Sequence, residues 1–141
     1  MYLLDTIVIS ELRKVGSGRA NASVALWADS VHAADLYISV ITVQELEIGV
    51  ALALRRDAQQ GAVLRNWMDR HVLPAFENRI LPVDLAVAQR SAQLNVPDPR
   101  PVREGLIAAT ALVHAMTVVT RNVADFQQCG FSLINPWDWV L

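Results

Sequence analysis

Cysteine, lysine and long apolar runs are all scarce in this chain. Its single cysteine, Cys129, excludes an internal disulfide and suits a reducing cytoplasm. The longest apolar stretch, residues 105–119, is interrupted by polar side chains and is too short to span a bilayer. The first apolar run contains Asp5 and follows no basic segment, unlike a signal peptide. We therefore expect a cytoplasmic protein with no membrane partner.

Basic residues are few, and their type is uneven. Of the 12 Lys and Arg residues, only Lys14 is a lysine, and the formal net charge is −2. A chain with this balance does not bind nucleic acid through a broadly basic surface. Arginine, however, grips phosphate in a bidentate fork. A few arginines beside a specific site could therefore still bind a phosphodiester.

Short strand-like runs alternate with helix-like runs along the 141 residues, of which 53% are hydrophobic. Strands are expected at residues 2–4, 36–40, 80–83, 117–119 and 131–134, and helices at residues 7–14, 23–32, 43–56, 62–72, 85–95, 104–115 and 123–127. This alternation predicts an α/β fold with a parallel sheet and helices on both faces. We expect the first strand to be central and the strand at residues 80–83 to lie at the border.

Four acidic residues lie where a strand-like run gives way to a helix-like run: Asp5, Glu45, Glu104 and Asp125. In a parallel sheet these junctions share the C-terminal edge, so the four carboxylates could meet in one pocket. Carboxylates gathered in this way repel one another unless a cation lies between them. Oxygen ligands suit hard divalent ions such as Mg²⁺ or Mn²⁺.

Three of these acids also have a capping interpretation. Thr42 and Glu45 have the spacing of a capping box. Glu104 is predicted in a first helical turn, where the helix dipole favours a negative charge. Asp125 stands three residues after the expected helix cap Asn122. Taken singly, each of these acids is more often structural than functional.

Asp5 has a capping alternative as well, because it precedes the first helix. Its position after the expected central strand favours a functional role equally. Asp84 is the useful contrast, since it follows the border strand and is expected to act as a cap only. The joint placement of the four acids at one edge favours a shared site over four separate caps.

The segments that carry these acids resemble the motifs of PIN-domain ribonucleases. They are residues 5–12, residues 41–46 with Gly49, residues 104–111 and residues 119–126, and the ending Asn135-Pro136-Trp137 is also similar. The resemblance runs in order over the chain and implies a single PIN domain at residues 1–141. The implied fold is three-layered, with a five-stranded parallel sheet. The resemblance is strongest to VapC-type toxins of toxin–antitoxin pairs, especially the FitB-like branch.

This resemblance implies a homodimeric endoribonuclease that needs Mg²⁺ or Mn²⁺ and is inhibited by a DNA-binding, VapB-like antitoxin. The residues that it implies as catalytic and metal-binding are Asp5, Glu45, Glu104 and Asp125. Thr6, Thr120 and Asn122 would support them. Arg103 and Arg121, which adjoin the third and fourth motifs, are the candidates for contacting RNA phosphates.

Departures from the family pattern keep a second hypothesis open. Ile7 stands where the family usually has Asn, and Glu104 stands where it usually has Asp. The alternative is a catalytically weakened PIN-like module that acts mainly through partner binding. Relatives place the fourth acid at the position of either Asn122 or Asp125, and we favour Asp125 because an amide carries no charge. A receiver domain would need a lysine after a late strand, whereas Lys14 is expected in the first helix.

Overall fold

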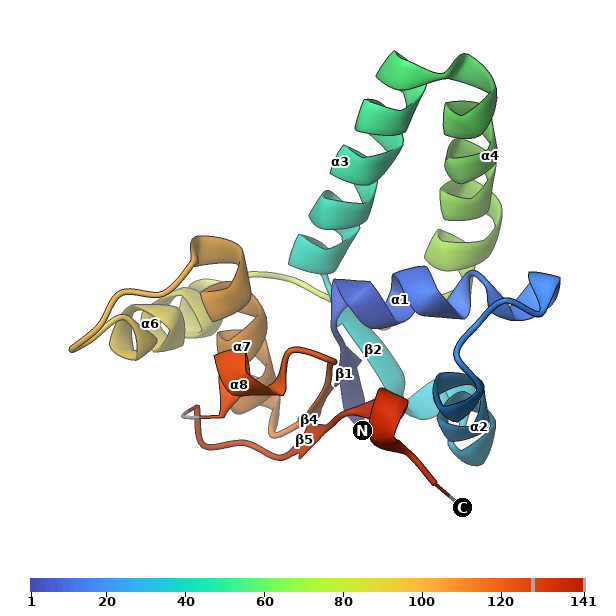
Figure 1. Ribbon diagram of the computed structural model, residues 1–141. Coiled ribbons are helices and arrows are strands. Elements are labelled where there is room, and N and C mark those ends of the chain that lie inside the picture. Colours follow the sequence, from blue (N-terminus) through green and yellow to red (C-terminus); the bar gives the residue numbers. More distant parts are fainter. Residues whose placement is uncertain (128, 141) are drawn as a thin grey trace.

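Five parallel strands form one sheet in the order β3-β2-β1-β4-β5 in the computed structural model, which describes residues 1–127 and 129–140 (Figure 1). The strands are β1 (Tyr2–Leu4), β2 (Leu36–Ser39), β3 (Ile80–Leu81), β4 (Thr117–Val119) and β5 (Leu133–Ile134). Leu3 pairs with Tyr37 of β2 and with Val118 of β4. The predicted parallel sheet is thus confirmed, with β1 at its centre and β3 at its border.

Helices cover both faces of this sheet (Figure 1). They are α1 (Thr6–Leu12), α2 (Ala22–Ser30), α3 (Val40–Arg56), α4 (Ala58–Trp67), α5 (Leu73–Ala75), α6 (Leu85–Leu94), α7 (Val102–His114) and α8 (Val123–Phe126). A π-helical segment, Met68–Val72, joins α4 to α5, and 3₁₀ turns lie at Val15–Ser17, Ala33–Asp35 and Pro136–Asp138. None of the helices described combines the length and the apolarity needed to cross a membrane.

Two hydrophobic clusters fill the space between the sheet and its helices. Successive residues of a strand point to opposite faces, and β1 shows this directly. Leu4 packs with Val8 and Trp27 in one cluster, whereas Leu3 packs with Ile107 in the other. Leu3 and Leu4 are both fully buried. The central strand therefore forms part of both cores, which gives the three-layer arrangement that was predicted.

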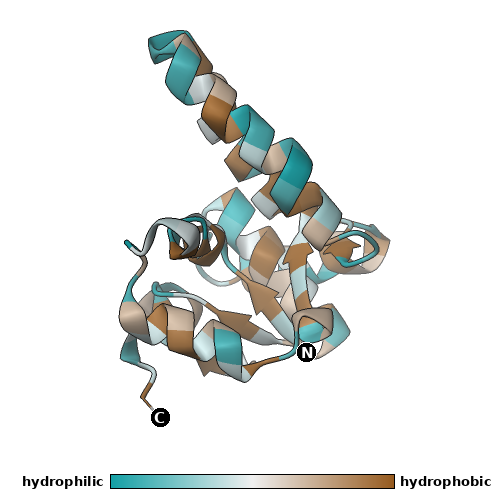
Figure 2. Ribbon diagram, turned by 90° about the vertical axis from the view of Figure 1, so that its right-hand side faces the viewer, coloured by the Kyte–Doolittle hydropathy of each residue, from teal (hydrophilic) through white to brown (hydrophobic). Residues whose placement is uncertain are grey.

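Helices α3 and α4 form an arm that projects from the sheet, and its surface mixes hydrophobic and hydrophilic residues (Figures 1 and 2). The two helices approach closely at Gly61, where an added Cβ would lie 2.4 Å from Leu54 Cα. Farther along the arm, Arg65 donates to both carboxylate oxygens of Glu47, at 2.6 and 2.8 Å. The arm is therefore held by one close backbone approach and one bidentate ion pair.

Helix boundaries differ from the sequence prediction at two informative places. The capping box predicted at Thr42 and Glu45 is wrong. Ser39 caps α3 instead, and its side-chain oxygen accepts from the Ile41 N–H at 3.0 Å. Thr42 is instead a fully buried residue inside the helix. Helix α4 begins at Ala58 rather than at residue 62, and Asp57 accepts hydrogen bonds from its first turn. The prediction for Asp84 is confirmed, since its side chain accepts from the Val87 N–H at 3.0 Å.

Glu104 does not follow a strand, which corrects the prediction for that acid. It lies in the first turn of α7, after α6 and a proline-rich loop. Helix α7 still starts at the pocket that Asp5 lines, so Glu104 lies beside the other acids. The shared edge was predicted correctly, but the connection that leads to it was not.

Candidate active site

One pocket collects all four predicted acids. It is lined by Asp5, Glu45, Glu104 and Asp125, together with Ile107, Asn122 and Phe126. The acids come from four separate elements: the end of β1, the helix α3, the first turn of α7 and the single turn α8. The structure therefore brings together the residues that the sequence grouped. Their catalytic role stays a prediction at this point.

Asp5 is the most enclosed of the four acids, with 8% of its surface exposed. Its Oδ1 accepts from the Thr6 N–H at 2.8 Å, and its Oδ2 accepts from the Thr120 hydroxyl at 2.8 Å. Burial raises the pKa of Asp5, and the charges of Glu45 and Asp125 raise it further, although the two hydrogen bonds oppose this. Asp5 is thus both a helix cap, through Oδ1, and a residue that lines the pocket.

Glu45 points back from α3 toward α1. Its Oε1 accepts from the Thr6 hydroxyl at 2.7 Å, and that hydroxyl lies 3.3 Å from Thr42 Oγ1. On the other side, Arg103 Nε lies 3.9 Å from Glu45 Oε2. Thr6 therefore fixes one oxygen of the carboxylate, while a half-exposed arginine approaches the other.

Glu104 and Asp125 form the more open side of the pocket. Burial raises the pKa of Glu104, and the charge of Asp125 and a hydrogen bond between the two carboxyl groups raise it further. Asp125 itself is exposed, on a helix of four residues. Asn122 occupies the cap position of that helix, and its N–H donates to Thr120 Oγ1 at 3.0 Å. Thr120 consequently links Asp5 to the start of α8.

The donor set of the pocket is suited to a hard cation. Its polar lining consists of four carboxylates and one amide, all of which offer oxygen. Among residues 1–127 and 129–140, no three His, Cys, Asp or Glu side chains already stand as a preformed metal cage. The carboxylates of the open side would have to close on an ion. The residues therefore fit a divalent metal chemically, with Asp5 and Glu45 already oriented by hydroxyl groups.

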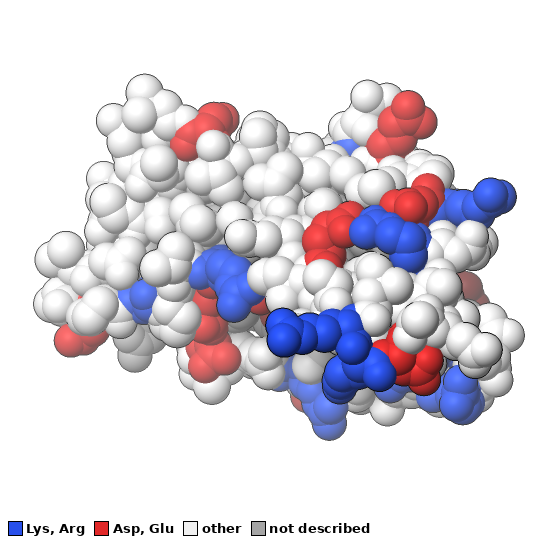
Figure 3. All heavy atoms as spheres, turned by 90° about the horizontal axis from the view of Figure 1, so that it is seen from above, with Lys and Arg blue, Asp and Glu red and all other residues white. Residues whose placement is uncertain are grey.

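On the face shown in Figure 3, basic residues are interspersed with acidic and uncharged ones. Arg121 lies over the Trp137 ring, 5.2 Å from its centroid, and Arg103 lies beside Glu45. Both arginines are exposed. Their predicted contact with RNA phosphates stays a prediction.

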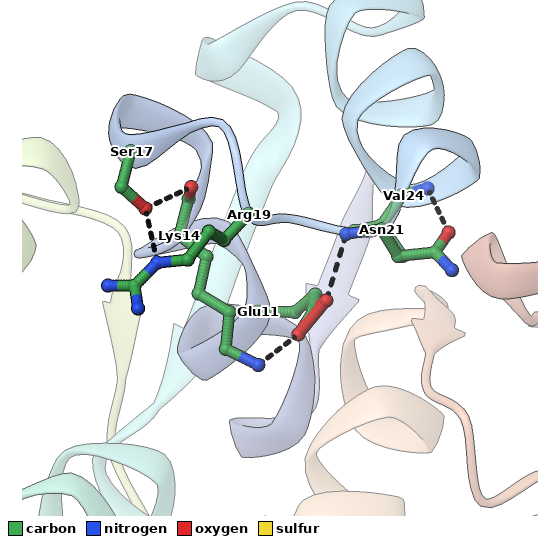
Figure 4. Close-up of polar contacts among 6 residues, drawn as sticks. All are labelled: Glu11, Lys14, Ser17, Arg19, Asn21 and Val24. Carbon is green, nitrogen blue, oxygen red and sulfur yellow. Dashed lines mark hydrogen bonds and ion pairs between the residues drawn. The ribbon is translucent and has the colours of Figure 1, made fainter.

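Lys14 has a structural contact that accounts for it (Figure 4). Its ammonium group lies 3.0 Å from Glu11 Oε2, and Glu11 Oε1 accepts from the Asn21 N–H at 2.9 Å. Glu11 therefore ties the end of α1 to the cap residue of α2, and Lys14 pairs with the same carboxylate. Lys14 is absent from the residues that line the acidic pocket, as the argument against a receiver domain requires.

Arg100 is the residue near the site that the sequence analysis missed. It belongs to the proline-rich loop, and its Nη1 donates to the main-chain oxygen of Asp125 at 3.1 Å. Its contact with Asp125 spans 25 residues, so local sequence spacing does not reveal it. Its flanking prolines, Pro99 and Pro101, were the only signal, since they restrict the path of the loop.

Comparisons with known proteins agree with this geometry. The model of the PIN domain family matches residues 2–131. Toxin FitB of Neisseria gonorrhoeae is 40% identical over 142 residues, covering 97% of this chain and 99% of the relative. VapC ribonuclease Y4jK of Sinorhizobium fredii is 38% identical over 143 residues, covering 98% and 99%.

A solved structure resembles this one closely over its whole length. The structure of FitAB bound to an IR36 DNA fragment superposes with a TM-score of 0.87 at 39% identity, and it covers 100% of this chain and 99% of that chain. Sequence and structure thus agree on the family over nearly the entire chain. The chain belongs to the PIN domain family, and within it to the group that contains the FitB and VapC toxins.

Proposed function

We propose that this chain is a metal-dependent endoribonuclease, the toxin component of a toxin–antitoxin pair, and that residues 1–141 act as one PIN domain. The observation that carries the proposal is the pocket of four carboxylates from four separate elements. Charges of one sign are costly to gather in a half-enclosed space unless a cation neutralises them. The ribonuclease name of the relative Y4jK supports RNA as the substrate.

Asp5, Glu45, Glu104 and Asp125 would hold one or two Mg²⁺ or Mn²⁺ ions in this proposal. A bound ion lowers the pKa of its water and stabilises charge on the phosphate. The hydroxyl of Thr120 holds Asp5 Oδ2, and the hydroxyl of Thr6 holds Glu45 Oε1. Both carboxylates are therefore oriented before any ligand arrives, which limits the reorganisation needed for binding.

The remaining groups would handle the substrate and its proton. One of the four carboxylates would accept the proton of the attacking water. Arg103 and Arg121 are exposed at the margin of the site and would bind phosphate oxygens of the RNA.

An antitoxin partner and a homodimer complete the proposal. The FitAB structure, which contains the FitB relative and a DNA fragment, supports a DNA-binding, VapB-like antitoxin for this chain. Helix α3 exposes Ile48, Leu52 and Leu54, and apolar surface of this kind favours a protein interface. The buried free thiol of Cys129 suits action in the cytoplasm.

A catalytically weakened PIN-like module that acts mainly through its partner is the second candidate. Ile7 packs against the hydrophobic core, so this position contributes no polar group beside the acids. Glu104 is one methylene longer than the usual Asp, and Mg²⁺ demands near-ideal octahedral geometry. These two features would lower the rate of cleavage while leaving the fold and its interfaces intact.

A cleavage assay on partner-free protein separates the two candidates. Single-stranded RNA is incubated with the purified chain in Mn²⁺, in Mg²⁺ and in EDTA, and a preparation of Asp5→Asn made in parallel controls for contaminating nuclease. We expect internal cleavage with either metal and none in EDTA. Full activity in EDTA would refute the metal mechanism. If the partner-free protein cleaved RNA in neither metal but still bound its antitoxin in a separate binding assay, the second candidate would be favoured.

A further inference from the structure

The short helix that carries Asp125 cannot hold its own position. Helix α8 has only four residues, and a single helical turn is not stable in isolation. Its buried anchor is Phe126, which is 2% exposed and lies 6.1 Å from the Phe131 ring, centroid to centroid. Asp125, its neighbour, is exposed and lines the pocket. Its location therefore depends on what else holds the turn.

Arg100 supplies that second attachment from the loop between α6 and α7. Its Nε donates to the Leu94 carbonyl at 3.2 Å, and its Nη1 donates to the Asp125 carbonyl at 3.1 Å. Its backbone N–H donates to Asn95 Oδ1 at 2.9 Å, and Asn95 in turn donates to the Ser91 carbonyl. One guanidinium group thus bridges the end of α6 and the turn α8.

The geometry of the bridge explains why this residue is an arginine. Its Nε and Nη1 donate to carbonyls of two different elements. Arginine suits this place because its planar fork reaches two carbonyls at once, whereas lysine offers a single point charge.

We propose that Arg100 is a positioning residue: it clamps α8 to the α6–α7 loop and so keeps Asp125 beside Glu104 in the metal pocket. This inference rests on the proposed metal site. It makes no demand on Arg100 to touch the substrate or the ion. Its consequence is that the affinity for the metal, more than the rate of the metal-saturated enzyme, depends on the clamp.

The test compares wild type with Arg100→Gln, which removes both the fork and the charge, and Arg100→Lys, which keeps the charge only. Arg90→Gln is the matched control, because Arg90 is an exposed arginine of α6 whose Nη1 donates to Gln93 Oε1 at 3.3 Å. Mn²⁺ binding to the partner-free protein is measured by calorimetry, and hydrogen exchange of residues 120–127 is measured by mass spectrometry without metal. Steady-state cleavage against Mn²⁺ concentration completes the set.

We expect Arg100→Gln to weaken Mn²⁺ binding about tenfold and Arg100→Lys about threefold, as for supporting residues around other metal sites. Residues 120–127 should exchange faster in both Arg100 variants, whereas the cleavage rate at saturating Mn²⁺ should stay within about threefold of wild type. Arg90→Gln should change none of the three: Mn²⁺ affinity, hydrogen exchange or cleavage rate. Unchanged exchange or unchanged Mn²⁺ affinity in Arg100→Lys would overturn the clamp, even if Arg100→Gln fails to fold. A wild type that binds no Mn²⁺ would overturn the proposed metal site itself, and this role of Arg100 with it.

Discussion

The two sides of the acidic pocket are held in different ways. On the β1 side, Asp5 is 8% exposed and is fixed by the fully buried Thr120. On the α8 side, Asp125 is exposed, on a single turn tied by Arg100. Buried hydrogen bonds are costly to break, whereas exposed ones compete with water. The β1 side is therefore built in advance, and the α8 side can close on a ligand.

The largest loss of activity should come from removing the charge of Asp5, on the β1 side of the pocket. Asp5→Asn keeps the shape of the side chain and an oxygen for the Thr6 N–H, so the fold should persist. Cleavage of single-stranded RNA should fall on the order of a thousandfold, as when a central catalytic group is lost. Asp84→Asn, at a helix cap that is not among the pocket-lining residues, should retain wild-type cleavage. Equal cleavage by Asp5→Asn and wild type would show that Asp5 acts only as a helix cap.

Glu104 tests whether the open side tolerates a displaced ligand. Its longer side chain should suit Mn²⁺ better than Mg²⁺, which demands near-ideal geometry. We expect wild type to cleave faster in Mn²⁺, Glu104→Asp to keep or raise the Mg²⁺-supported rate, and Glu104→Gln to lose most activity. The measurement is cleavage rate against metal concentration for the three proteins. If Glu104→Gln matched wild type in both metals, Glu104 would be only a helix-start residue.

A change at Thr120 should show how much the orientation of the Asp5 carboxylate contributes to metal binding and activity. Thr120→Val removes the hydroxyl that donates to Asp5 and accepts from the Asn122 N–H, while it keeps the volume. We expect about 10- to 100-fold loss of metal affinity or activity and about 1–3 kcal/mol of lost stability, measured by Mn²⁺ titration and urea unfolding. Thr120→Ser should restore most of both. If Thr120→Ser lost as much metal affinity and stability as Thr120→Val, the loss would come from altered packing and not from the missing hydroxyl.

The smallest expected effect is on thermal stability, and it should differ between Asp5 on the β1 side of the pocket and Asp125 on the α8 side. The folded state raises the pKa of Asp5, chiefly through burial, so its ionised form disfavours folding at neutral pH. In EDTA, Asp5→Asn should therefore unfold at a higher temperature than wild type near pH 7. The difference should vanish at pH values below the ordinary Asp pKa of 3.8, where both side chains are neutral.

Asp125→Asn provides the contrast on the other side. The exposed carboxylate of Asp125 keeps its water, so we expect its replacement to change the unfolding temperature less than Asp5→Asn does. Thermal unfolding in EDTA at several pH values would compare the two variants directly. A larger gain from Asp125→Asn would mean that burial does not distinguish the two sides.

Much of this protein could be predicted from its sequence. Alternating strand-like and helix-like runs predicted the parallel sheet with β1 at the centre and β3 at the border. The helix cap at Asp5 was readable because it joins two adjacent residues, Asp5 and Thr6. The family was readable because the relatives share the same segments in the same order.

Sequence reasoning was weaker where a role depends on distant contacts. Local spacing suggested that Glu45 caps with Thr42, but Ser39 caps the helix, and Glu45 instead meets Thr6, 39 residues away. Glu104 was expected after a strand and follows a loop, because the acids share an edge through folding rather than through one repeated connection.

The sequence by itself determined the fold, the family and the identity of the acids, since hydrophobic period, composition and motif order are local properties of the chain. Only the tertiary structure decided how each acid is held. It gave Asp5 a buried hydroxyl partner 115 residues away, and it gave Asp125 an exposed turn tied by an arginine 25 residues before it. Burial and long-range hydrogen bonds exist only once distant segments pack together, so the difference between the two sides of the pocket arises in the folded chain.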